Sequence, residues 1–72
     1  MKYIKSLTPI MGTLQVVWSD GHIDGYDMVD LGCDWFRMSN DCFYEVYGFN
    51  FNPHDYPGLY ERCRDIVYPK KF

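Results

Sequence analysis

The stretch TLQVVWSDG, residues 13–21, decides the fold. Leu14, Val16 and Trp18 recur at every second position, which is the period of a strand with one buried face. The next three residues, Ser-Asp-Gly, supply a turn, because aspartate tolerates turn positions and glycine adopts a positive φ without a Cβ clash. A chain that reverses directly after an alternating strand indicates an antiparallel hairpin.

The returning strand is expected to begin near residue 22 and to run toward Leu31, with a bend at Gly25. A two-residue turn would place Ile23 beside Trp18, whereas a three-residue loop with a bulge would place His22 there, and the sequence leaves both registers open. After Gly32, alternation over Cys33–Met38 indicates a third strand. The sequence therefore predicts a small antiparallel β-meander over about residues 13–38.

Two short helices are expected to follow the meander. Either Ser39 or Asn40 can cap a helix over about residues 40–48, and Gly48 is a natural stop. A second helix over about residues 57–68 begins near Pro57, because proline fits the first helical turn. We predict one α+β domain, residues 1–72, in which the helices pack on the sheet. Its predicted core takes one face of each element: Leu14, Val16, Trp18, Phe43, Val46, Leu59, Cys63, Ile66 and Val67.

Aromatic side chains allow so short a chain to form a core. Its 72 residues include seven Tyr, five Phe and two Trp, and each ring can bury roughly 150–250 Å². The first residues lack the apolar run and cleavage site of a signal peptide, and no run approaches the ~18 apolar residues of a membrane span. We therefore expect a cytoplasmic protein with no membrane contact and with reduced thiols.

Charge is distributed unevenly along the chain. The net charge is −3, yet residues 20–45 hold seven acidic residues and one basic residue, Arg37, for a net charge of −6. Such an acidic block repels phosphate and attracts basic surfaces, so we expect no direct nucleic-acid binding and a protein partner with a basic surface. The expected partner-binding residues are these acids and the aromatics among them, since Tyr and Trp are favoured interface anchors: Asp20, Asp24, Tyr26, Asp27, Asp30, Asp34, Trp35, Tyr44 and Glu45.

Two questions about the acidic block stay open at the level of sequence. On strands, Asp24 and Asp30 are expected to share one face while Asp27 lies on the other, unless glycine bulges change the pattern. The block could also serve only to keep an aromatic-rich domain in solution. A partner-binding surface and a solubility device both predict negative surface charge, and they differ in whether that charge is clustered.

Residues that could carry metal or nucleophilic chemistry are present but poorly spaced. Structural zinc sites usually draw ligands from pairs two to four residues apart, and none of the histidines and cysteines is paired in that way. The glycines of GHIDG and DLGCD fit neither a dinucleotide fingerprint nor a phosphate loop. We therefore expect no metal, no cofactor and no enzymatic activity. The histidines and cysteines that could act as metal ligands or nucleophiles are His22, Cys33, Cys42, His54 and Cys63.

The opening heptapeptide Met1–Leu7, MKYIKSL, resembles the opening of a phage anti-CRISPR protein that acts on type I surveillance complexes. In size, acidity and aromatic content the chain is similar to small phage-encoded inhibitors. The resemblance implies a non-enzymatic inhibitor that occupies a nucleic-acid-binding groove of a host protein or blocks a subunit contact in the host cytoplasm. The alternative expectation is a small structural or regulatory domain.

Overall fold

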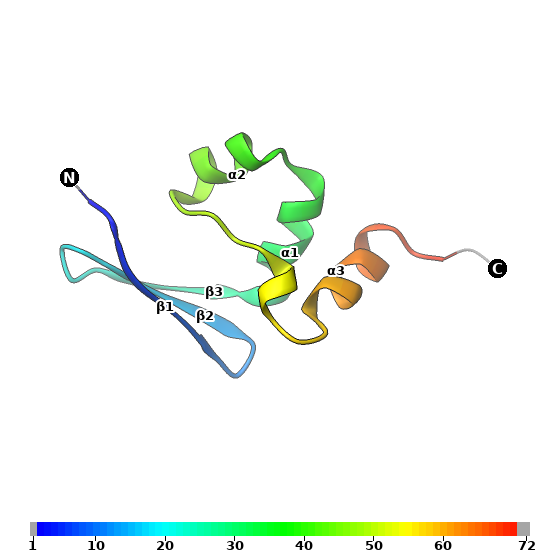
Figure 1. Cartoon of the computed structure of the whole chain (residues 1–72), viewed down its shortest axis with the longest axis horizontal. Coiled ribbons are helices and arrows are strands. Elements are labelled where there is room, and N and C mark those ends of the chain that lie inside the picture. Colours follow the sequence, from blue (N-terminus) through cyan, green and yellow to red (C-terminus); the bar gives the residue numbers. More distant parts are fainter. Residues whose placement is uncertain (1, 71–72) are drawn as a thin grey trace.

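The computed structural model describes residues 2–70, as a three-stranded antiparallel sheet followed by helices on one side of it (Figure 1). This order confirms the predicted α+β class and the antiparallel meander. The elements are β1 (Ile4–Ile10), β2 (Thr13–Trp18), β3 (Ile23–Asp27), α1 (Met28–Arg37), α2 (Asn40–Tyr47), the 3₁₀ turn η1 (Pro53–Asp55) and α3 (Leu59–Val67).

The sheet begins and ends earlier in the chain than predicted. Its first strand, β1, pairs with β2 and was not predicted. The third strand predicted at Cys33–Met38 is wrong, because those residues belong mostly to α1. Of the two registers left open, the three-residue loop is the one formed: the Trp18 N–H donates to the His22 carbonyl at 2.9 Å, and Gly21 completes the loop at φ 89°.

A cap explains why the chain turns from strand to helix within one residue. One carboxylate oxygen of Asp27 accepts the backbone N–H groups of Val29 at 2.9 Å and Asp30 at 3.1 Å, which satisfies the first amides of α1. Asp27 is therefore an N-cap and Asp30 a helical residue. The expectation that Asp30 shares a strand face with Asp24 is wrong for this reason, whereas Asp27, the last residue of β3, lies on the opposite face from Asp24 as predicted.

Gly32 marks the closest approach of α1 to α3. A Cβ atom added there would lie 2.2 Å from Cys63 Sγ and 3.1 Å from Cys63 Cβ, so no larger residue fits without displacing one of the helices. Gly32 was predicted to separate the second strand of the meander from a third strand. Its actual role is to leave room between the two helices for the side chain of Cys63.

The core lies between the sheet and the helices and is largely aromatic. Leu14, Val16 and Trp18 are buried from β2, as predicted. Phe49 and Phe51 also enter the core, because the segment after α2 is extended and sends alternate side chains inward. The rings of Phe43 and Phe49 meet edge to face at a centroid distance of 6.1 Å.

Two predicted core residues are exposed. Val46 is 64% exposed because α2 turns Phe43 and Tyr47 inward instead, and Ile66 is 48% exposed because Leu59 and Cys63 form the buried stripe of α3. Val67 is only partly buried. Helical spacing identified both α2 and α3, but each helix buries a narrower stripe of side chains than predicted.

We predict that Gly32→Ala destabilises the protein. Alanine normally stabilises a helix interior by about 1 kcal/mol relative to glycine, whereas here its methyl group would overpack Cys63 and cost about 1–3 kcal/mol. Urea unfolding should show the loss, and Cys63→Ala should reduce it by removing the sulfur atom. Gly25→Ala is the control, because its methyl would meet only Thr13 Cγ2 at an ordinary 3.6 Å. An unchanged midpoint for Gly32→Ala would contradict the close helix contact.

Candidate functional site

Three carboxylates of the acidic block have local structural roles. Asp20 accepts the backbone N–H of His22 at 3.0 Å and fixes the β2–β3 turn. Asp24 accepts from Trp18 Nε1 at 2.9 Å and meets His22 Nε2 at 3.0 Å, and the tryptophan hydrogen bond lowers the pKa of Asp24 below its ordinary value. Asp27 caps α1. These three acids therefore form hydrogen bonds within the fold.

A second group of predicted residues gathers around Tyr47. The Tyr47 hydroxyl donates to Asp34 Oδ2 and so links α2 to α1. Tyr26 of β3 meets the same ring nearly at right angles, with centroids 5.5 Å apart. Asp30 lies one helical turn before Asp34. The structure therefore brings Tyr26, Asp30 and Asp34 together through a residue that was not among the predicted binding residues.

Asp30 and Asp34 line an open groove of about 520 Å³ between the helices, which we call the acidic groove. In the described part of the chain, the Asp30 carboxylate accepts no hydrogen bond, and Arg37 forms no ion pair with either acid. The groove thus holds two carboxylates against one guanidinium group. Its lining residues are Val29, Asp30, Cys33, Asp34, Arg37, Tyr47 and Ile66.

The hydrogen bond to Asp34 raises the pKa of Tyr47 to about 12. Partial burial and the negative charges of Asp34 and Asp30 act in the same direction, because an ionised phenolate would be poorly solvated and repelled. The Tyr47 hydroxyl is therefore protonated at neutral pH and can only donate to the carboxylate. This donor holds one wall of the acidic groove in place.

The remaining predicted binding residues lie outside the acidic groove. Trp35 packs edge to face against the rings of His54 and Tyr60, each at a centroid distance of 6.3 Å. Tyr44 and Glu45 are exposed on α2 and do not line the groove. The nine residues therefore do not form one surface. Of the nine, only Asp30 and Asp34 line the acidic groove, together with one residue of the predicted core, Ile66.

The cysteines and histidines do not form a metal site in the part of the chain that the structure describes, since no three possible ligands gather there. Cys33 and Cys63 are buried thiols. Burial, with Cys33 as the next cause, raises the pKa of Cys63 to about 11, so this thiol stays protonated at neutral pH. The ring of His54 stacks on that of Tyr60 with a centroid distance of 3.9 Å and is part of an aromatic cluster.

No protein-family model, curated protein or solved structure matches the chain. Over residues 2–70, every helix is too short or too polar to cross a lipid bilayer. The acidic groove combines an open shape and apolar walls with two carboxylates that form no ion pair among the described residues.

We predict that Tyr47→Phe changes how stability depends on pH. Because the folded-state pKa of Tyr47 lies above its ordinary value of 10, its stabilising effect is complete below pH 10 and is lost as the pH rises toward 12. The variant should be less stable at pH 7 by about 1 kcal/mol for the lost hydrogen bond. The difference from the wild type should shrink between pH 10 and pH 12.

Denaturant unfolding at a series of pH values measures this difference. Tyr44→Phe, on the exposed side of the same helix, is the matched control and should follow the wild type throughout. A gap between wild type and Tyr47→Phe that stays constant through the alkaline range would exclude the Tyr47–Asp34 hydrogen bond as its cause.

Proposed function

We propose that the chain is a non-enzymatic protein-binding domain whose acidic groove receives a basic side chain of a partner protein. The observation that carries this proposal is the pair Asp30 and Asp34, whose carboxylates line an open groove without an internal cationic partner in the described structure. Three other acids of the block accept hydrogen bonds within the fold: Asp20 in the β2–β3 turn, Asp24 in the hairpin and Asp27 at the start of α1. The groove is where two carboxylates of the block lie beside apolar walls and an aromatic ring.

An arginine side chain suits the groove best. Residues four apart on a helix lie about 5–6 Å apart at their Cβ atoms, so a planar guanidinium group could donate to both carboxylates at once. The half-buried Tyr47 ring offers a face for cation–π contact. Val29 and Ile66 supply apolar surface for the methylene stem of the bound side chain.

The overall charge favours the approach of a basic partner. A net charge of −3, concentrated as −6 in residues 20–45, speeds encounter with a positive surface and disfavours phosphate. The narrower form of the proposal follows from the resemblance of residues 1–7 and from this charge. In it, the domain is an inhibitor acting in a host cytoplasm, and the partner is a basic nucleic-acid-binding groove such as that of a type I CRISPR surveillance complex.

The second candidate is a structural or regulatory domain whose acidic residues serve solubility alone. The engagement of Asp20, Asp24 and Asp27 in local hydrogen bonds favours it for those three positions. It gives no reason for two carboxylates without an ion-pair partner in the described structure to line one groove with Tyr47. The two candidates differ in whether loss of charge at the groove matters more than loss of charge elsewhere.

We predict that N-acetyl-arginine amide shifts the backbone NMR signals of α1 between Val29 and Arg37, and that the isosteric, uncharged citrulline derivative does not. Asp30→Asn together with Asp34→Asn should weaken binding about tenfold or more, because hydrogen bonds to charged groups contribute about 1.5–3 kcal/mol each. Asparagine at position 34 still offers an acceptor to Tyr47, so the fold should persist.

Glu45→Gln is the matched control, since it removes one exposed carboxylate outside the acidic groove. It should leave arginine binding nearly unchanged, and salt should weaken binding by the wild type more than by the double variant. Equal losses in Glu45→Gln and in either single groove variant would point to net charge alone and favour the solubility function.

A further inference from the structure

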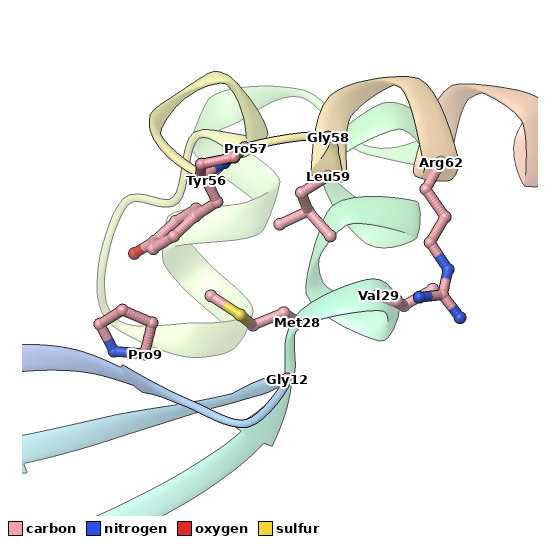
Figure 2. A pocket seen from close by; sticks show the side chains of 9 residues that line it. All are labelled: Pro9, Gly12, Met28, Val29, Tyr56, Pro57, Gly58, Leu59 and Arg62. Atoms are coloured by element: carbon pink, nitrogen blue, oxygen red, sulfur yellow. The ribbon is translucent and has the colours of Figure 1, made fainter.

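A second groove, also bordered by Val29, lies between the β1–β2 turn and the first residues of α1 and α3. Its volume is about 390 Å³. In Figure 2 the side chain of Leu59 points toward Met28, whose side chain extends toward Pro9 and Tyr56 at one end of the groove. Arg62 stands at the other end with its guanidinium group directed away. We call this surface the turn groove, and its interior is apolar.

Met11, in the turn beside this groove, is an unusual residue for its position. Ile10 pairs with Thr13, so Met11 and Gly12 form a two-residue hairpin turn with φ values of 48° and 82°. Turns of this kind favour Asn-Gly, because both central residues adopt left-handed conformations that a residue with a larger side chain enters only at a cost. The side chain of Met11 is also 100% exposed. An apolar side chain held in solvent by a strained backbone gains nothing within its own fold.

The β1–β2 hairpin itself carries no charged side chain around Met11, and the nearest charged residues are Asp27, the partner of Thr13, and Arg62 at one end of the groove. Residues 6–19 contain no Asp, Glu, Lys or Arg, in a chain of which 24% of the residues are charged. These residues form most of the β1–β2 hairpin, and its turn projects at the bottom of Figure 1. Two molecules that each carry a net charge of −3 repel each other over most orientations. Contact through this hairpin adds no charged side chain of residues 6–19 to the interface, and Asp27 and Arg62 at its border have opposite signs.

We propose that two copies of the chain associate through their β1–β2 turns, with Met11 of each copy inserted into the turn groove of the other. The projecting side chain and two walls of the groove, Pro9 and Gly12, belong to the same turn. A two-fold axis beside that turn therefore satisfies both insertions at once and closes the assembly at a dimer. Methionine suits this role, because its unbranched, polarizable side chain adapts to irregular apolar surfaces.

The dimer goes beyond the proposed function, since its surface excludes Asp30 and Asp34. It also accounts for the choice of residue at position 11. Asparagine or glycine there would relieve the backbone but would leave the turn groove of the partner copy empty. The strained, exposed methionine is thus explained by a contact that each molecule makes with its neighbour.

Sedimentation equilibrium from micromolar to millimolar concentration tests the proposal. The wild type should show a reversible monomer–dimer equilibrium. Met11→Asn should raise the dimer dissociation constant about 100-fold, because one apolar side chain is withdrawn from each of two grooves. The same variant should unfold at a higher denaturant concentration than the wild-type monomer, because asparagine tolerates the left-handed conformation. Met11→Leu, which keeps an apolar side chain, should remain dimeric.

The turn groove can be tested separately. Pro57→Lys places a charge at an exposed wall of the groove and should abolish the dimer while the fold persists. Val46→Ser removes an equally apolar, exposed residue far from the turn and should leave the equilibrium unchanged. A wild type that stays monomeric at millimolar concentration, or a dimer that survives Met11→Asn, would overturn the proposal.

Discussion

The direct contact of α1 with α3 at Gly32 and Cys63 is the constraint on which the rest of the structure depends. Because Asp27 ends β3 and caps α1 without a linker, the sheet fixes where α1 lies. The contact at Gly32 then fixes where α3 lies. Both grooves take walls from these two helices, and Val29 of α1 borders each of them. A wider helix separation would alter both grooves together.

Aromatic packing holds the part of the molecule that this contact does not reach. Phe49 meets Trp18 at 6.5 Å and Phe43 at 6.1 Å between ring centroids, so rings rather than backbone contacts tie α2 to the sheet. Large flat side chains bury much surface per residue, which a chain of 72 residues requires. The Tyr47–Asp34 hydrogen bond adds the one polar link between α2 and α1 in the described structure. Because Tyr47 and Asp34 both line the acidic groove, this hydrogen bond also fixes their positions in its wall.

Features encoded by neighbouring residues could be predicted from the sequence. The alternation of β2, the Ser19–Gly21 turn and the cap at Ser39 are all local, and each is present. The first strand could not be found in this way, because six of the seven residues of β1 are exposed and leave no alternation of buried and exposed positions. α1 was missed because Gly32 looks like a helix breaker until the sulfur of Cys63 is placed against it.

The candidate site was predicted in part for the same reason. Asp20 and Asp27 bond to backbone groups two or three residues ahead, a pattern that the sequence contains, yet they were counted as surface charge. Asp30 and Asp34 were predicted as binding residues alongside Tyr26, Trp35 and Tyr44, but the aromatic residue that bonds to Asp34 was not among them. That residue is Tyr47, thirteen positions after Asp34, and only the tertiary fold brings it there.

The order of the elements along the chain has a consequence for synthesis on the ribosome. The sheet is complete at Asp27, but Gly32 finds its partner only when Cys63 has been made. At about 5–20 residues per second, that interval lasts about 2–7 s. The pairing of strands that are neighbours in sequence is fast by comparison. The apolar face formed by Leu14, Val16 and Trp18 can therefore assemble early and stays uncovered until the rings that pack on it, such as that of Phe49, have been synthesised.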